Sequence, residues 1–284
     1  MKKKSLYASA FACLTVLALF LYGGGKMADS KPSEYTGSIK NTAAKLTKVG
    51  DAFNAPTGIA FDSTGAMYVT NWSGNSVVKI KTNGERETIY DNIASPAGIV
   101  IDAQNNIFVS SYSDDYILKI TPDGKSEKIS DGYHTPTGIA FSNKGQLLVT
   151  NRSTGEIVAL DLQTGRKQIV AKGLSTPVGV TQLPDNSLVV SQYSGRLTLI
   201  QPNGKQVEIG SGFNRPGVGI VTIAPTVVAV IDNGADMVRK IDVKTQKTTT
   251  IVSSISGAVA LAYHQNHFYI GGWGNGTIYS YPNE

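Results

Sequence analysis

The stretch PTGIAFD at residues 56–62 recurs as PAGIVID at residues 96–102 and as PTGIAF at residues 136–141. With Gly58 as the marker, equivalent positions follow at intervals of 40, 40, 41, 40 and 40 residues, at Gly98, Gly138, Gly179, Gly219 and Val259. A period of this size is typical of solenoids, propellers and arrays, in which neighbouring units bury one another's apolar faces. The sequence therefore predicts six copies of one unit between Phe53 and the C-terminus.

Each copy has the pattern of four short strands. In the first copy we expect strand A at 58–62, strand B at 66–70, strand C at 76–81 and strand D at 85–90. Asn83-Gly84 separates strands C and D, and Asn-Gly between alternating apolar runs is a strong hairpin signal. The same place is taken in later copies by Asp123-Gly124, Thr164-Gly165 and Asn203-Gly204. Four strands per copy favour a propeller over a solenoid.

The two ends of the repeat region complement each other. The sixth copy stops after its strand C, near Tyr281, and residues 44–50 form a strand-like run ahead of the first copy. A strand from the N-terminus would complete the sixth blade and remove the open sheet edges. We therefore predict an all-β fold: a closed six-bladed β-propeller of residues 44–284 with four-stranded blades.

Residues 1–26 have the layout of an export segment. Three lysines, Lys2 to Lys4, precede an apolar run from Leu6 to Tyr22, as in a signal peptide. The run is also long enough for an N-terminal membrane anchor, and no clear cleavage site follows it. Both interpretations predict an extracytoplasmic propeller that is periplasmic, secreted or anchored facing outward. Residues 27–43 are predicted to be a polar linker.

The charge and the cysteine content of the sequence exclude several classes of binding partner and site. The chain has 26 Lys and Arg against 21 Asp and Glu, but four of the lysines lie in the first 26 residues, which leaves 22 against 21. The propeller has no basic block, so we expect no nucleic-acid partner, and membrane contact only through an uncleaved N-terminus. Cys13 is the only cysteine, so the repeats contain no disulfide or thiolate site. A monomer is expected.

Propeller geometry groups the candidate site residues. Loops from strand D to the next strand A emerge on the same face as the loops from strand B to strand C, and loops on a rigid scaffold carry function. We call the positions just after strand B the inner polar ring: Asn71, Ser111, Asn151, Gln192, Asp232 and Gly272. We call the following positions the second ring: Trp72, Tyr112, Arg152, Tyr193, Asn233 and Trp273. His134, in a loop from strand D to strand A, is a further candidate.

Each ring has two interpretations. The polar side chains can line a binding funnel, or they can cap their own loops by bonding to backbone N–H groups. The aromatic side chains can stack on a sugar or planar ligand, or they can pack between adjacent blades. His264 and His267 are expected in a solvated turn on the opposite face rather than in a zinc pair.

The repeated Pro-x-Gly-Ile-Ala-Phe-Asp phrase resembles NHL-repeat propellers and the related streptogramin-lyase and gluconolactonase (SMP-30-like) six-bladed families. The likeness extends over all six copies. It implies the propeller fold, and two kinds of activity known in those families. In gluconolactonase-like enzymes the residue between Pro and Gly often holds a divalent metal, whereas in the lyases it is a functional histidine.

This chain departs from both catalytic patterns. The residues between Pro and Gly are expected to be Thr57, Ala97, Thr137, Val178, Val218 and Ala258, and none is a general base or a strong metal ligand. The lyases also use a glutamate after strand B, and no member of the inner polar ring is a glutamate. We identify no catalytic residue.

The sequence thus favours a binding protein without catalysis. The predicted ligand is a protein, a peptide or a glycan bound on the face that carries the two rings, and no cofactor is expected. The alternative is an enzyme: a streptogramin-lyase-like enzyme, or a lactonase or other hydrolase in which Asn71, Asn151 and Asp232 coordinate Ca²⁺ from alternate blades.

Overall fold

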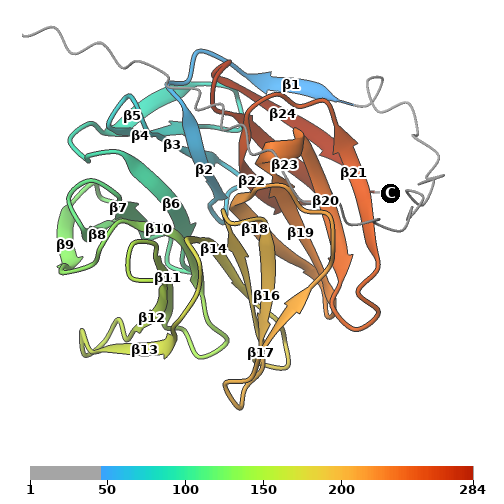
Figure 1. Cartoon of the computed structure of the whole chain (residues 1–284). Coiled ribbons are helices and arrows are strands. Elements are labelled where there is room, and N and C mark those ends of the chain that lie inside the picture. Colours follow the sequence, from blue (N-terminus) through green and yellow to red (C-terminus); the bar gives the residue numbers. More distant parts are fainter. Residues whose placement is uncertain (1–45, 284) are drawn as a thin grey trace, which may run out of the picture. The chain divides into compact units, whose positions relative to one another are not determined.

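The computed structural model describes residues 46–283, which form six four-stranded antiparallel sheets (Figure 1). Blade 1 contains β2 (Pro56–Phe61), β3 (Met67–Asn71), β4 (Ser76–Ile80) and β5 (Arg86–Tyr90). Blade 2 contains β6 (Pro96–Ile101), β7 (Ile107–Ser111), β8 (Tyr116–Ile120) and β9 (Ser126–Ser130). Blade 3 contains β10 (Pro136–Phe141), β11 (Leu147–Asn151), β12 (Glu156–Leu160) and β13 (Lys167–Ala171).

The second half of the repeat region continues the series. Blade 4 contains β14 (Pro177–Gln182), β15 (Leu188–Gln192), β16 (Arg196–Ile200) and β17 (Gln206–Ile209). Blade 5 contains β18 (Pro216–Ala224), β19 (Val227–Asp232), β20 (Met237–Asp242) and β21 (Thr248–Ser253). Blade 6 contains β22 (Ala258–His264), β23 (His267–Gly272), β24 (Thr277–Pro282) and β1 (Thr47–Gly50). The predicted all-β, six-bladed propeller is confirmed.

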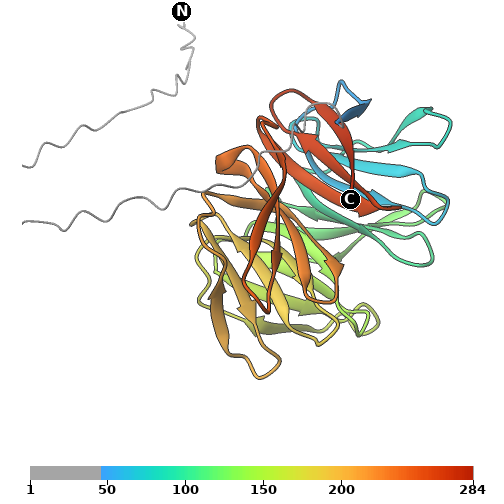
Figure 2. The same ribbon diagram turned by 90° about the vertical axis from the view of Figure 1, so that its right-hand side faces the viewer.

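The N-terminal strand closes the ring, as the sequence predicts. β1 pairs antiparallel with β24, with Thr47 opposite Ser280, so the two ends of the propeller share one sheet (Figures 1 and 2). The Phe53 N–H then donates to the Gly276 carbonyl at 3.0 Å. The inner strands make contact in the cyclic order β2, β6, β10, β14, β18, β22 and back to β2. Blades 3 and 6 therefore face each other across the central axis.

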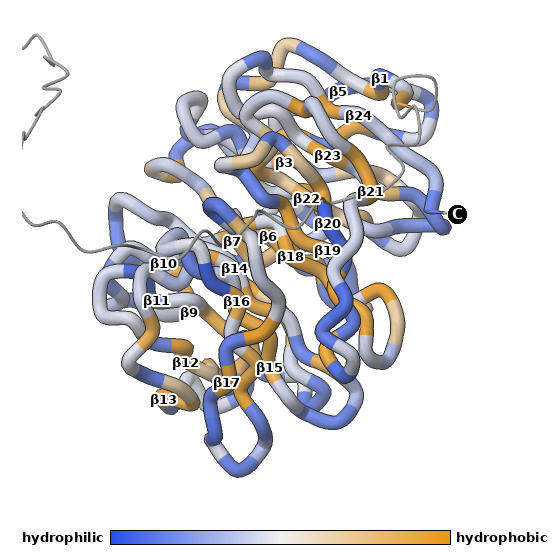
Figure 3. Tube along the Cα trace, turned by 45° about the vertical axis from the view of Figure 1, so that its right-hand side comes forward, coloured by the Kyte–Doolittle hydropathy of each residue, from blue (hydrophilic) through white to orange (hydrophobic). Residues whose placement is uncertain are grey.

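The core is divided among the blade interfaces. Each of six clusters of buried apolar side chains joins two neighbouring blades, and the last joins Phe53 and Met67 of blade 1 to Ile278 of blade 6. Along the chain, hydrophobic stretches coincide with strands and hydrophilic ones with turns (Figure 3). Burial of apolar surface between blades thus stabilises ring closure as well as each sheet.

The repeated glycine is required by the close approach of the inner strands. A Cβ atom on Gly58 would lie 2.6 Å from the Ala97 carbonyl oxygen, and one on Gly138 would lie 2.5 Å from that of Val178. Only glycine leaves room for this backbone contact. The marker of the repeat is therefore a packing signal, which recurs in the first five blades, at Gly58, Gly98, Gly138, Gly179 and Gly219.

The sixth copy differs by one residue from the predicted alignment. Pro56 pairs with Asn71 in blade 1, whereas Ala258 pairs with Gly272 in blade 6, so Ala258 takes the place of Pro56. Val259 is then the residue between "Pro" and "Gly", and the assignment of Ala258 to that place is wrong. The sixth copy lacks both the proline and the marker glycine, so nothing in its sequence fixed the alignment.

In blade 1 the strand boundaries differ from prediction by one or two residues. Strand B of blade 1 runs from Met67 to Asn71 instead of 66–70, so the inner polar ring lies at the ends of the strands rather than after them. The only helical segment within 46–283 is η2 (Asn233–Ala235), a 3₁₀ turn, and no helix in that range has the length and hydropathy of a membrane span. The predicted export segment and linker lie outside the described residues.

Candidate functional site

The second ring converges on one cavity at the face formed by the loops from strand B to strand C. All six of its members line a hollow of about 340 Å³ at the centre of this face. The rest of the lining comes mainly from the ends of the inner strands: Thr57, Thr137, Val218, Gly257 and Val259. Cavities of this size are large enough to hold a small molecule or a side chain. We call it the aromatic cavity.

Arg152 lies among the phenol rings of this cavity. Its Nη1 atom donates to the Tyr112 hydroxyl at 2.6 Å. The guanidinium carbon lies 5.8 Å from the centre of the Tyr112 ring and 5.7 Å from that of Tyr193, within the range of cation–π attraction. Tyrosines from the two neighbouring blades therefore hold the side chain in place.

The remaining aromatic walls come from tryptophan. Trp72 packs against Tyr112 of the next blade, with ring centres 4.5 Å apart and planes at 56°, so these rings pack between blades and line the cavity at once. Trp273 is 44 % exposed, which is unusual for so large an apolar side chain. An exposed indole beside a cavity suits contact with a ligand.

Burial changes the ionisation of Tyr193. Desolvation raises the pKa of its hydroxyl above the usual 10.0, and the nearby positive charges of Arg152 and Arg215 oppose that rise only in part. Tyr193 is therefore a neutral phenol at physiological pH. The cavity lining thus combines two indoles, two phenols, an amide from Asn233 and one permanent cation. These groups can stack, donate hydrogen bonds and neutralise a negative charge.

The inner polar ring does not line this cavity, because its members are buried beneath the loops. The Asn71 Oδ1 atom accepts from the Asn54 N–H at 3.1 Å, and the Asn151 Oδ1 atom accepts from the His134 N–H at 2.6 Å. Both asparagines are under 5 % exposed. Each one fixes the loop that enters its own blade, as the capping interpretation predicts.

The ring members of blades 4 and 5 likewise accept from backbone N–H groups, and that of blade 2 donates to a backbone carbonyl. Gln192 accepts from the Ser175 N–H, and the Ser111 hydroxyl donates to the Ala94 carbonyl at 3.0 Å. Asp232 is completely buried and accepts from the Asn214 and Arg215 N–H groups at 3.0 and 2.9 Å. It also lies 3.2 Å from Nη1 of Arg239, which gives the carboxylate a charged partner. These contacts leave the five polar members of the ring committed to the scaffold.

The contacts of Asn71, Asn151 and Asp232 bear on the alternative in which these residues coordinate Ca²⁺. It requires Asn71, Asn151 and Asp232 to turn oxygens toward one ion. Each of these oxygens instead accepts backbone N–H groups of its own blade, and Asp232 is paired with a guanidinium. Within residues 46–283 no group of three His, Cys, Asp or Glu side chains is arranged to hold a metal. The donor set present in this arrangement does not fit a cation.

Two histidines remain from the sequence candidates. His134 is exposed on its loop and is absent from the lining of the aromatic cavity. His264 ends β22, opposite His267, and its ring stacks on that of Phe61 with centres 4.2 Å apart. His264 therefore packs against blade 1 at the far end of the central channel, where the sequence predicted only a solvated turn.

A row of hydrogen bonds from hydroxyl groups joins neighbouring blades and was not predicted from the sequence. The Thr70 hydroxyl donates to the Ala97 carbonyl of the next blade at 2.8 Å, and the Ser191 hydroxyl donates to the Gly217 carbonyl at 2.6 Å. The signal was present, because Thr or Ser precedes the inner polar ring in four copies, at positions 70, 110, 150 and 191. These bonds tie the inner strands together just below the aromatic cavity.

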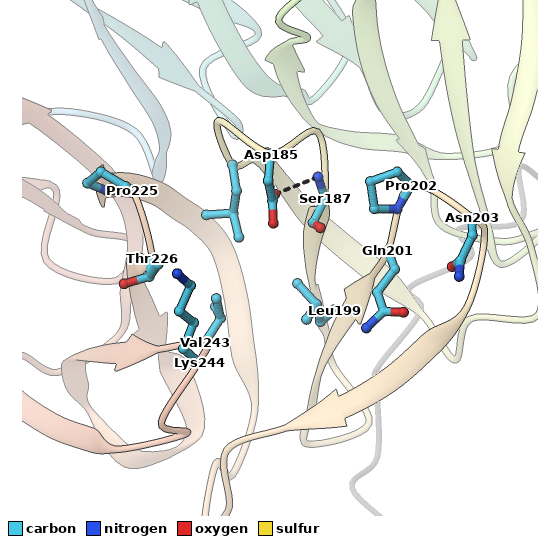
Figure 4. A pocket seen from close by; sticks show the side chains of 11 residues that line it. Asp185, Ser187, Leu199, Gln201, Pro202, Asn203, Pro225, Thr226, Val243 and Lys244 are labelled. Atoms are coloured by element: carbon cyan, nitrogen blue, oxygen red, sulfur yellow. Dashed lines mark hydrogen bonds between the residues drawn. The ribbon is translucent and has the colours of Figure 1, made fainter.

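Two other hollows lie on the opposite face. One, of about 400 Å³, is the far end of the channel and is lined mainly by inner-strand residues such as Phe61, Phe141 and His264. The other, of about 370 Å³, lies between turns of blades 4 and 5, where Asp185 and Lys244 contribute its charged groups (Figure 4). Neither combines several aromatic walls with a cation held among them.

No family model matches the sequence, and no curated protein matches it. Solved structures do match. A gluconolactonase from Xanthomonas campestris superimposes with a TM-score of 0.73 at 17 % identity, over 84 % of this chain and 89 % of the other. Virginiamycin B lyase from Staphylococcus aureus gives 0.64 at 16 % identity, over 84 % and 99 %. A chain of a nidogen/laminin complex gives 0.62 at 23 % identity, over 69 % and 79 %.

The fold is that of six-bladed propellers. Identities this low establish architecture and leave chemistry open, since one propeller scaffold supports enzymes as well as binding proteins. The resemblance seen in the repeated phrase is therefore supported at the level of the fold.

Proposed function

We propose that this protein is an exported binding propeller, without catalysis, whose ligand inserts a ring into the aromatic cavity. The observation that carries the proposal is the convergence of Trp72, Tyr112, Tyr193 and Trp273, from four different blades, on one hollow. A rigid, closed scaffold holds these rings in place before any ligand arrives, which lowers the entropic cost of binding. The ring that enters such a site can belong to a small molecule, a glycan, a peptide or a protein side chain.

The tryptophans provide a direct assay. The chain contains two, Trp72 and Trp273, and both line the aromatic cavity. Intrinsic tryptophan fluorescence therefore reports on this site alone. Panels of glycans and peptides can be screened by this signal, and we expect at least one member to change it in a saturable way.

Trp273→Ala tests the site without harming the fold. Trp273 is 44 % exposed and belongs to none of the buried apolar clusters, so the variant should keep the melting temperature of the wild type while losing most of its affinity. Ile169→Ala is the matched control, because Ile169 is 54 % exposed on the outer strand β13. Unchanged affinity in Trp273→Ala, measured by calorimetry, would refute this site.

Export belongs to the same proposal and rests on residues 1–26. A fusion of these residues to a reporter that is active only outside the cytoplasm should be active, and deletion of Leu6 to Tyr22 should abolish the activity. A reporter that stays inactive in the intact fusion would contradict export.

A further inference from the structure

The charge of the aromatic cavity narrows the ligand further, an inference that rests on the proposed binding function. Arg152 is the only charged residue in the lining. Within residues 46–283 its guanidinium forms no ion pair, and its one hydrogen bond is to the Tyr112 hydroxyl. Its Nε atom is buried without a partner in the same range.

A guanidinium without an ion pair and with a buried unpaired donor lowers the stability of the folded protein unless another group interacts with it. Arg152 is half-buried, and a guanidinium carries a fork of N–H donors and cannot lose its proton, so even its partial withdrawal from water without a counter-ion destabilises the folded protein. The two phenol rings compensate in part through cation–π attraction. The remaining donors and the unneutralised charge call for an anion, and a carboxylate matches the guanidinium fork in geometry.

The position of Arg152 in the second ring also limits the shape of the ligand. Arg152 follows β11 of blade 3 and Trp273 follows β23 of blade 6, and these blades face each other across the axis. A ligand held at Arg152 by a negative group would therefore extend its other end toward the exposed indole. On the remaining sides the wall consists of three aromatic rings, from Trp72, Tyr112 and Tyr193, and the Asn233 amide, which suits a flat and mostly apolar body.

We propose that the aromatic cavity binds a small aromatic carboxylate, with the carboxylate on the Arg152 guanidinium and the ring against Trp273. The unpaired cation supplies the affinity for the acid group, and the indole supplies the stacking surface. The volume of about 340 Å³ suits one ring and a short side chain rather than an extended polymer.

Matched probes test the charge requirement. 3-Phenylpropionate and 3-phenylpropionamide have the same ring and length, and only the first is an anion. Titration of the full chain with each, followed by tryptophan fluorescence, should show the acid binding about 10-fold or more tightly than the amide, because the neutral amide cannot form the bidentate ion pair that a carboxylate makes with the guanidinium. Affinity for the acid should fall with added salt, and affinity for the amide should not.

Variants assign the effect to Arg152. Arg152→Met should remove the preference for the acid, leaving both probes equally weak, and Arg152→Lys should retain part of it. Arg166→Met is the control, since Arg166 is exposed in the turn between β12 and β13. A purely structural role for Arg152 would lower the melting temperature in circular dichroism and leave the acid-to-amide ratio of the folded fraction unchanged.

The outcomes separate this inference from the proposed function. Equal affinities of the acid and the amide for the wild type would overturn the carboxylate assignment and leave ring binding in place. A response only to a peptide that ends in phenylalanine would overturn the small-molecule assignment. No response to either probe at millimolar concentration, together with a response to a neutral glycan, would refute the inference while supporting the cavity as a site.

Discussion

Asn151 and Arg152 are neighbours in the chain, yet they serve different parts of the molecule. Asn151 is 4 % exposed and holds the loop that carries His134, whereas Arg152 reaches the aromatic cavity between two tyrosines. The contrast holds for the inner polar ring and the second ring as a whole. Polarity in a loop of a propeller is therefore a poor guide to ligand contact, because backbone N–H groups at the entry of each blade need acceptors first.

The strongest test of this division is Asp232→Ala. The variant removes the acceptor for two N–H groups and leaves Arg239, whose side chain is only 18 % exposed, without its carboxylate. We expect the free energy of unfolding to fall by about 3 kcal/mol, measured by urea denaturation. The exposed Asp114→Ala on the same face is the control. Wild-type stability in Asp232→Ala would break the comparison.

The next largest expected effect is the difference in stability between variants of Asn151 and Arg152 in blade 3. Asn151→Ala should lose about 1–2 kcal/mol of stability, because the His134 N–H loses its acceptor, while the cavity keeps its lining. Arg152→Met should change stability by no more than about 0.5 kcal/mol, because the loss of the hydrogen bond to the Tyr112 hydroxyl is offset by the removal of an Nε donor that is buried without a partner. Thermal unfolding of the two variants measures both changes in stability. A larger loss in Arg152→Met than in Asn151→Ala would contradict a structural role for Asn151 and a binding role for Arg152.

Alkaline pH offers a smaller effect confined to the second ring. Burial raises the pKa of Tyr193, so the unfolded chain releases this proton before the folded one does. The stabilising contribution is complete below the ordinary value of 10.0 and declines as pH rises toward the folded-state pKa. Tyr193→Phe should therefore lose less stability than the wild type above that pH, as judged from urea midpoints. Parallel curves for the two proteins would contradict a buried phenol.

The smallest expected effect concerns calcium. If the oxygens of Asn71, Asn151 and Asp232 stay with their backbone partners, millimolar Ca²⁺ should leave the melting temperature unchanged. An ion that binds the folded state would raise it in proportion to the logarithm of its concentration. A calcium-dependent rise that disappears in Asp232→Ala would restore the metal-dependent hydrolase as the better interpretation.

The sequence predicted the architecture well because the decisive signals are local and repeated. The hairpin turns, the marker glycines and the surplus strand at residues 47–50 each have a direct structural cause in the blades. The prediction failed by one residue in blade 6, where Val259 rather than Ala258 points to the cavity, because that copy lacks the proline and the glycine that define the register.

By itself, the sequence determined how many blades there are, how the ring closes and which six positions form the second ring. Only the tertiary structure decided that the inner polar ring is buried under its own loops, that Arg152 lies between tyrosines of two other blades, and that His264 packs on Phe61. The contacts of the inner polar ring join residues 17 or 18 positions apart, and those of Arg152 and His264 join residues forty or more positions apart. The orientation of a side chain at the end of a strand depends on which neighbouring blade supplies its partner, and a repeat pattern does not contain that information.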